Sequence, residues 1–236
     1  MKDLYKGYRA DIDGLRFLAI LAVVINHFNK ELLPMGYLGV DIFFVISGFV
    51  ISMSLLNSKK TLFRDYIYEF YNKRIKRILP ALGFYVLLMG LLTALFIPMP
   101  GASLKTGIFA MFGLSNIHLY SQSIDYFASS SDLNPFTNTW SLSVEEQFYL
   151  IFPLIIWFFA AKDKKDKNNI FVLKIFLSIL CFGSFIVFAY SYNLNTSFAY
   201  YLIPARFWEI GLGCISYLIV SNKKTIFENK KIAICS

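Results

Sequence analysis

Charged residues are scarce in this chain of 236 residues. Lysine, arginine, aspartate and glutamate make up only 16% of it, whereas 57% is hydrophobic. Soluble domains have about a quarter charged residues, so the deficit excludes an ordinary soluble domain and indicates a polytopic membrane protein. Cysteine is scarce too. The three cysteines, Cys181, Cys214 and Cys235, lie in apolar stretches and form neither a disulfide framework nor a metal-ligand spacing.

A signal peptide is not evident either. The first ten residues, MKDLYKGYRA, are polar, and no small-residue cleavage site follows the first apolar run. The net charge of +8 would suit a nucleic-acid-binding protein. However, the lysines and arginines gather between apolar segments, which is the pattern that orients membrane helices. We therefore expect a bilayer and no nucleic acid as the partner.

Hydropathy predicts an all-α fold, a polytopic transmembrane helix bundle of about six to seven membrane helices. The predicted helices cover about residues 15–28, 37–56, 78–97, 145–161, 170–191 and 199–220. A further helix is expected to start at Ile232. Because helix 78–97 leaves the cytoplasm and helix 145–161 returns to it, the apolar stretch near 104–120 is expected to be re-entrant or interfacial. The alternative is that it spans and a turn elsewhere restores the count.

Basic segments predict the orientation of the bundle. Residues 59–77, 162–169 and 222–231 are rich in lysine and arginine, so we expect them, and the N-terminus, to face the cytoplasm. The stretches 98–139 and 191–198 contain a single lysine and no arginine. They are therefore expected to lie outside.

Two ionisable residues mark the first apolar segment. Arg16 opens it, and His27 follows eleven residues later. On a helix this spacing puts them about 16 Å apart and near one face. An arginine at the centre of a membrane helix costs about 2.5 kcal/mol or more, so we interpret the pair as a polar track through the membrane. The alternative is that both lie among headgroups and only anchor the helix. The other histidine, His118, is expected to be exposed to solvent.

The second apolar segment carries one acidic residue, Asp41. A carboxylate at membrane depth needs a partner or a cavity, which makes Asp41 a candidate site residue. Gly39 and Gly48 are expected to permit close helix packing.

Arg74 and Arg77 lie three residues apart on one face of a predicted helix. Guanidinium groups suit phosphate, which they bind through two parallel hydrogen bonds. The alternative is topogenic charge that meets lipid headgroups, which is the interpretation we favour for Lys73 and Lys76.

The segment NTWSLSVEEQFYLIFP, at 138–153, combines an aromatic residue, hydroxyls, carboxylates and an amide. Helix capping by Thr139 or Ser141 explains one glutamate near the helix N-terminus, and tryptophan is common at membrane interfaces. The set also resembles a sugar-binding surface, and its candidate substrate-binding residues are Trp140, Ser141, Glu146 and Gln147. Further on, Arg206 and Glu209 are expected to form a structural ion pair.

Five segments occur in order: YRADIDGLRFLAILAVVINHF, GYLGVDIFFVISGFVIS, RIKRILPA, NTWSLSVEEQFYLIFP and PARFWEIGLG. Together they resemble acyltransferase family 3, a family of bacterial inner-membrane enzymes that O-acylate cell-surface polysaccharides, lipopolysaccharide among them. The family's Arg-x10-His motif maps onto Arg16 and His27. Its Arg-x-x-Arg motif maps onto Arg74 and Arg77, and its tryptophan motif maps onto 140–148.

The resemblance implies transfer of an acyl group, in most cases acetyl, from cytoplasmic acyl-CoA to a glycan hydroxyl outside. Arg74 and Arg77 would hold the phosphates of acetyl-CoA, which is a donor substrate, with no permanently bound cofactor and no metal. His27 would act as general base or carry the acyl group, and Arg16 would orient the donor. Asp41 or Glu145 would hold the imidazole in its tautomer.

The family's bundle is larger than this one. We therefore expect 1–236 to form the N-terminal two-thirds of a membrane acyltransferase domain whose C-terminal helices are missing, with a missing half or a separate domain as a partner. A competing interpretation is a transporter or flippase subunit that moves a polar solute along the intramembrane charges. A third is an inactive fragment.

Overall fold

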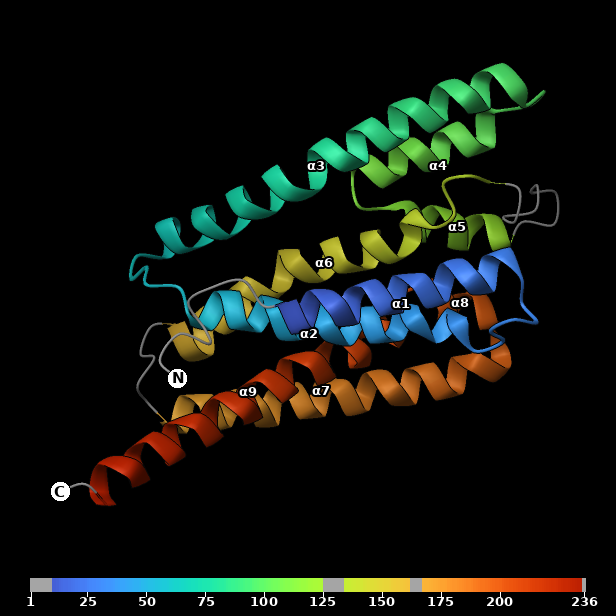
Figure 1. Cartoon of the computed structure of the whole chain (residues 1–236). Helices are drawn as coiled ribbons and strands as arrows, with labels where there is room; N and C mark the ends of the chain where they lie inside the picture. The colour runs from blue at the N-terminus through green and yellow to red at the C-terminus, as the bar shows by residue number, and fades with distance from the viewer. Residues whose placement is uncertain (1–9, 125–133, 162–166, 235–236) are drawn as a thin grey trace. The chain divides into compact units, whose positions relative to one another are not determined.

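The computed structural model describes residues 10–124, 134–161 and 167–234, and the regular structure of this part of the chain is helical (Figure 1). The predicted all-α fold is confirmed. The chain divides into two compact units. The first contains the residues up to Ser54 together with those from Glu209 onward, and the second runs from Leu55 to Trp208.

The first unit is built around close contacts between helices. Its elements are α1 (Ala10–Phe28), the 3-10 helix η1 (Gly36–Leu38), α2 (Gly39–Leu56) and the part of α9 (Ile203–Ile234) that follows Trp208. Gly39 lies against the carbonyl oxygen of Ala19, so α2 begins in direct contact with α1. The loop between them is closed by Asn26, whose Nδ2 donates to the carbonyl oxygen of Leu33 at 2.8 Å.

Two glycines bring α2 and α9 into backbone contact. A Cβ atom at Gly48 would overlap the carbonyl oxygen of Ile210, and one at Gly213 would overlap that of Val45. The packing expected for Gly39 and Gly48 is therefore confirmed. Only a residue without a side chain permits this approach, so the two glycines are what allows α2 and α9 to cross so closely.

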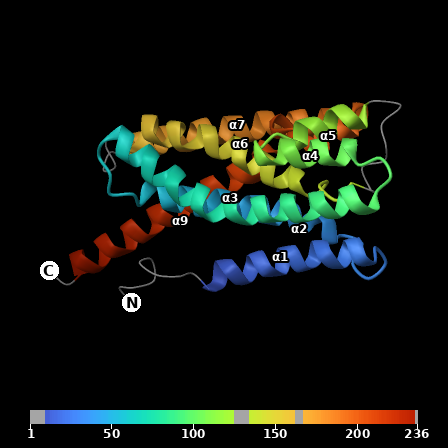
Figure 2. The same ribbon diagram turned by 90° about the horizontal axis from the view of Figure 1, so that it is seen from above.

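The second unit combines long helices with a short helical hairpin, residues 101–123 (Figure 2). Its elements are α3 (Phe63–Phe96), α4 (Gly101–Met111), α5 (Ser115–Ser123), α6 (Thr139–Ile156), the π-helix η3 (Trp157–Ala161), α7 (Lys167–Leu194), α8 (Thr196–Tyr201) and the start of α9. α4 packs on α3, and α5 packs on α6 and α8. α7 packs on α8.

Helices α4 and α5 lie where the sequence predicts a re-entrant or interfacial segment. They have 11 and 9 residues, whereas about 20 residues are needed to cross a bilayer. The chain turns between them at Gly113, which has a φ of 66°. Residues 104–114 therefore do not span, as predicted.

Five helices of the described part are long and apolar enough to cross a membrane, against the six to seven expected. These spans are Gly36–Leu56, Phe63–Phe96, Thr139–Phe159, Asn168–Leu194 and Thr196–Ser221. α1 is not among them, and its first two turns carry Asp11, Asp13 and Arg16. The apolar stretch 15–28 is shorter than a membrane span, and α1 extends it back through the charged turns to Ala10.

Two helices run further than predicted. α3 begins at Phe63, so more than half of the basic segment 59–77 is helical. α9 continues through Ile232, where a new helix was expected to start. In both stretches the sequence offers neither glycine nor proline to end the helix.

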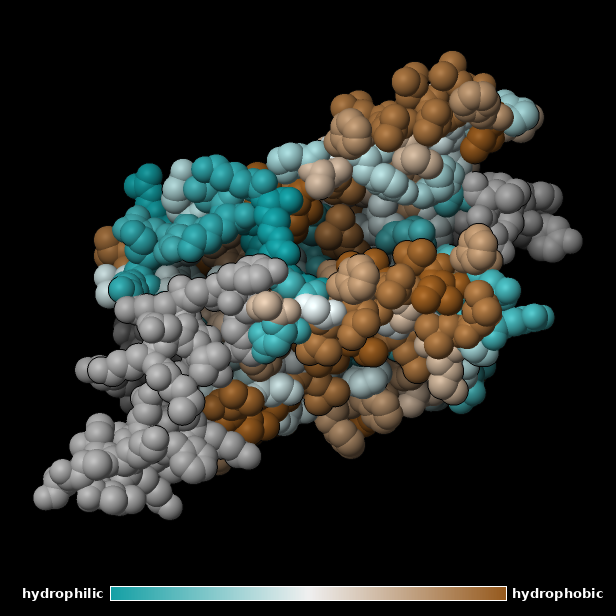
Figure 3. Space-filling model, in the orientation of Figure 1, coloured by the Kyte–Doolittle hydropathy of each residue, from teal (hydrophilic) through white to brown (hydrophobic). Residues whose placement is uncertain are grey.

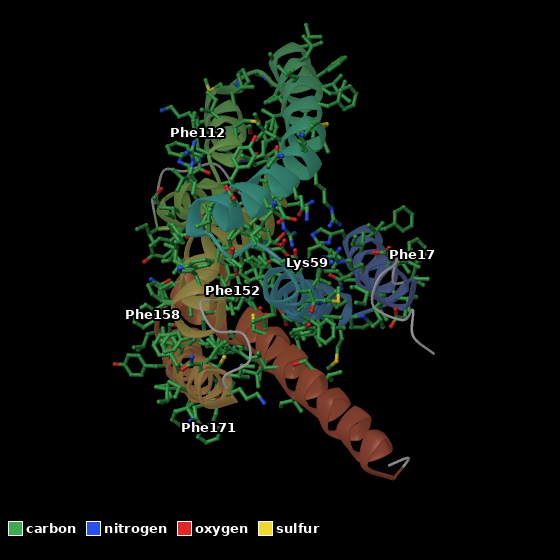
Figure 4. The ribbon with its side chains drawn as sticks, turned by 90° about the vertical axis from the view of Figure 1, so that its left-hand side faces the viewer. Phe17, Lys59, Phe112, Phe152, Phe158 and Phe171 are labelled. Carbon is green, nitrogen blue, oxygen red and sulfur yellow. The ribbon has the colours of Figure 1, made fainter. Side chains whose placement is uncertain are left out.

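Apolar side chains cover much of the outer surface. Figure 3 shows a hydrophilic N-terminal half and a hydrophobic C-terminal half of α3. In Figure 4, Phe112, Phe158 and Phe171 point away from the second unit, whereas Phe152 lies within it. An outward-facing apolar surface of this kind is what lipid requires.

Candidate active site

His27 lies in the last turn of α1, and the helix itself holds its ring. Nδ1 is 2.9 Å from the carbonyl oxygen of Val23. A carbonyl oxygen only accepts a hydrogen bond, so this contact assigns the proton to Nδ1 and leaves Nε2 as the accepting nitrogen. The side chain is exposed. The sequence predicts a carboxylate, Asp41 or Glu145, as the group that holds the imidazole in its tautomer. That role stays a prediction, and the described contact of Nδ1 is with a backbone oxygen one turn earlier.

The other candidates of the first unit are Arg16 and Asp41, and both are half-buried. The guanidinium carbon of Arg16 lies 5.6 Å from the ring centre of Phe43, a cation–π distance. Asp41 lies in the first turn of α2, where a negative charge is favoured. The catalytic roles of both residues stay predictions.

In the second unit, two predicted site residues meet through a tyrosine. Glu145 and Tyr149 lie one turn apart on α6 and are 4% and 5% exposed. The Tyr149 hydroxyl donates to Oε2 of Glu145 at 2.7 Å. Arg74, on α3, places its Cζ 4.7 Å from the centre of the Tyr149 ring. Tyr149 was not singled out by sequence reasoning, although it lies within the tryptophan segment.

The two arginines of α3 are not equivalent. Arg74 is half-buried against aromatic rings, whereas Arg77 is exposed. Lys73, beside them, pairs with Glu69 one turn earlier on the same helix. The structure thus leaves Arg77 at the surface as the more accessible cation for an anionic ligand.

Gln147 joins α6 to the α4–α5 hairpin. Its Nε2 donates to the Asn116 side-chain oxygen and to the Gly113 carbonyl oxygen, each at 2.8 Å. One turn earlier, the hydroxyls of Ser143 and Ser115 are 2.7 Å apart. The predicted substrate-binding role of Gln147 stays a prediction, but its amide already holds the hairpin. Sequence reasoning missed Asn116 and Ser115, because no local pattern connects them with residues about thirty positions away.

The remaining polar candidates lie along the same helix. A Cβ atom on Gly113 would come within 2.6 Å of Oε2 of Glu146, so this carboxylate lies against the glycine of the turn. Ser141 is half-buried, and its hydroxyl donates to the Asn138 carbonyl oxygen at 3.4 Å. Neither residue is fully buried, so both stay candidates for contact with a substrate.

Trp140 is a packing residue in this structure. Its side chain is 3% exposed, and its ring centre lies 4.5 Å from that of Tyr200. The guanidinium carbon of Arg206 is 5.6 Å from the Trp140 ring and 5.3 Å from the Tyr200 ring. These contacts cover the indole, so its predicted sugar-binding role stays a prediction. The ion pair expected between Arg206 and Glu209 also stays a prediction.

His118 differs from expectation. It is half-buried, and its ring stacks on Phe109 with the centres 4.6 Å apart. Burial, with a smaller contribution from the charge of Lys105, lowers the pKa of His118. The expected exposure was wrong, because α4 and α5 fold against each other and enclose the ring. His118 is therefore a neutral packing residue of the hairpin at pH 7.

A metal site does not emerge from the geometry. Within the described ranges, no three side chains of histidine, cysteine, aspartate or glutamate gather where they could hold a metal ion.

Comparison with known proteins places the chain in a family. A family model described as an acyltransferase domain matches residues 9–233. O-acetyltransferase OatA of Staphylococcus aureus (strain NCTC 8325 / PS 47) is 36% identical over 209 residues, which cover 88% of this chain and 34% of that protein. A putative O-acetyltransferase of Staphylococcus aureus (strain MSSA476) is 35% identical, with the same shares covered. No solved structure matches the chain.

The chain spans about a third of the length of these curated relatives. The family model nevertheless covers nearly all of it, from the segment with Arg16 and His27 to α9. The chain therefore belongs to the acyltransferase 3 family and is homologous to bacterial O-acetyltransferases.

Proposed function

We propose that this chain forms the membrane domain of an O-acetyltransferase. It would transfer an acetyl group from cytoplasmic acetyl-CoA to a hydroxyl of a cell-surface glycan outside. The observation that carries the proposal is the state of His27, with the Nδ1 proton directed at Val23 and the ring exposed. A neutral imidazole in this state accepts a hydroxyl proton near neutral pH. The names of the relatives support the acetyl group, and the family resemblance supports the glycan.

In the proposed reaction, Nε2 of His27 removes the proton of the acceptor hydroxyl while its oxygen attacks the thioester carbonyl carbon. A carbon–oxygen bond forms and the carbon–sulfur bond breaks. The imidazolium then returns its proton to the departing thiolate, which releases CoA as a thiol. The Val23 carbonyl keeps the second proton on Nδ1 throughout, and Arg16 on the same helix orients the donor.

The donor site is proposed to lie on α3. Arg77 is exposed, and Arg74 is half-buried with its guanidinium carbon over the Tyr149 ring. Guanidinium groups suit phosphate, because their N–H donors match its oxygens in pairs. These two residues would therefore hold the phosphates of acetyl-CoA. The acceptor is proposed to meet Ser141 and Glu146, which are both partly accessible.

The proposal is tested by incubating membranes that contain the full-length protein with acetyl-CoA and an acceptor glycan. Consumption of acetyl-CoA is expected only when the glycan is present. A transporter or flippase would leave acetyl-CoA intact under both conditions, and that result would refute acetyl transfer.

Replacement of Arg77 by glutamine is expected to raise the KM for acetyl-CoA about tenfold, with little change in the KM for the glycan. The reason is the loss of a charge-assisted hydrogen bond to phosphate, worth about 1.5–3 kcal/mol. Arg77→Lys should recover only part of the loss, because lysine lacks the planar guanidinium group with its paired N–H donors.

Lys76→Gln is the matched control for Arg77→Gln, since Lys76 is an exposed cation directly before it. The KM for acetyl-CoA should change far less in this variant. Equal increases in both variants would show that general positive charge, and not the guanidinium of Arg77, attracts the donor.

Single cysteines in a cysteine-free background are expected to report the predicted orientation. Ser58→Cys and Asn168→Cys should resist a membrane-impermeant thiol reagent added outside intact cells, because basic segments are retained in the cytoplasm. Asn193→Cys, in the uncharged segment 191–198, should react. Strong external labelling at position 58 or 168 would reverse the orientation and with it the proposed side of the donor.

A further inference from the structure

We propose that Tyr149 is a positioning residue that couples Arg74 to the carboxylate of Glu145. This inference deepens the proposed function and rests on it for the roles of Arg74 and Glu145. The contacts that carry it are a hydrogen bond, a cation–π contact and the anchoring of α3 on α6.

The hydrogen bond fixes one oxygen of the carboxylate. Glu145 and Tyr149 are four residues apart on α6, so their side chains lie on the same face of the helix. The Tyr149 hydroxyl donates to Oε2 of Glu145 at 2.7 Å, and both side chains are at least nine-tenths buried. In such surroundings a hydrogen bond to a carboxylate is stronger than in water and favours the ionised form.

The cation–π contact acts on the aromatic ring of the same tyrosine. The guanidinium carbon of Arg74 lies 4.7 Å from the ring centre of Tyr149 and 5.7 Å from that of Phe70. A positive charge over the ring draws electron density from the phenol. This makes the hydroxyl a better donor to Glu145, so the influence of Arg74 reaches the carboxylate through the ring.

A second tyrosine anchors α3 at the same place. The Tyr71 hydroxyl donates to the carbonyl oxygen of Leu150 at 3.0 Å and also approaches that of Tyr149 at 3.4 Å. Tyr71 and Arg74 are three residues apart, so one turn of α3 contacts α6 twice around Tyr149. Arg77, the next residue of the arginine pair, is exposed. The two arginines therefore have different functions. Arg77 only binds the donor, acetyl-CoA, whereas Arg74 also influences the carboxylate of Glu145.

The coupling is measured without substrate, by the rate at which a hydrophobic carbodiimide modifies Glu145 in the purified protein. Carbodiimides react with protonated carboxyl groups, and mass spectrometry of the peptide separates Glu145 from Glu146. Tyr149→Phe keeps the ring and removes the hydroxyl. It should increase the modification rate of Glu145 about tenfold, because the carboxylate loses a hydrogen bond that favours its ionised form. Arg74→Gln should produce a smaller increase of the same sign.

Two controls separate the coupling from a general structural effect. Tyr71→Phe removes a hydroxyl from the same helix contact without touching Glu145, and Arg77→Gln removes the exposed arginine. Both should leave the Glu145 rate near that of the wild type. An unchanged Glu145 rate in Tyr149→Phe, or equal increases in Arg74→Gln and Arg77→Gln, would overturn the coupling. Because no acetyl group is transferred in this assay, these outcomes are independent of the proposed function.

Discussion

Replacement of His27 by glutamine is expected to reduce glycan acetylation about 10²–10⁴-fold in the full-length protein, which is the usual contribution of a general base. Glutamine retains some hydrogen bonding, but its amide takes up no proton near neutral pH. The abundance of the variant in the membrane should be near normal, because the His27 side chain is exposed and its one described hydrogen bond is local to α1. The measurement is label transferred from acetyl-CoA to the glycan per unit of protein.

The matched control is His118→Gln, which alters the other histidine of the chain. His118 packs against Phe109 in the α4–α5 hairpin, so its replacement should lower stability modestly and leave the rate per folded molecule nearly unchanged. Substantial acetylation by His27→Gln would exclude the role of His27 as base or as acyl carrier. The residue would then be an interfacial group that only anchors α1.

Replacement of Gly48 by valine is expected to destabilise the first unit by about 3 kcal/mol or more, beyond the usual cost of overpacking. The new side chain would collide with the carbonyl oxygen of Ile210 on α9, which is backbone and cannot rotate away. Gly213→Val should have a similar effect, because a side chain there meets the carbonyl oxygen of Val45. Thermal unfolding of the detergent-purified protein measures the loss.

Gly14→Val is the control for this crossing. Gly14 lies on α1 in the same unit, and a Cβ atom there meets nothing within 4 Å. The variant should unfold near the wild-type temperature. If Gly48→Val unfolds at the same temperature as Gly14→Val, the close approach of α2 and α9 does not stabilise the first unit.

Local periodicity and charge predicted much of the fold. The apolar stretches gave the main helices, because lipid demands long apolar segments whose backbone groups pair internally. The same reasoning was less accurate at helix ends. The polar first turns of α3 look like a loop by hydropathy, yet neither glycine nor proline occurs between Phe63 and Arg77 to end the helix there.

The sequence did not predict contacts between segments that are distant along the chain. Residue chemistry and the family resemblance together marked His27 and Glu145 as candidates, but the backbone oxygen that Nδ1 of His27 contacts has no signature in sequence. The contact of Arg74 with Tyr149 joins positions 75 residues apart. Trp140, a residue typical of sugar-binding surfaces, is enclosed by Tyr200 and Arg206, and the sequence does not indicate this packing.

Acetyl transfer across the bilayer is tested most directly in sealed vesicles that hold the full-length protein in one known orientation. Radiolabelled acetyl-CoA is supplied on one side and the acceptor glycan on the other. Labelled glycan should form only when acetyl-CoA faces residues 59–77 and the glycan faces residues 98–139, and it should not form with His27→Gln. Equal labelling in both arrangements, or labelling only when both substrates share one side, would contradict transfer from cytoplasmic acetyl-CoA to an external hydroxyl.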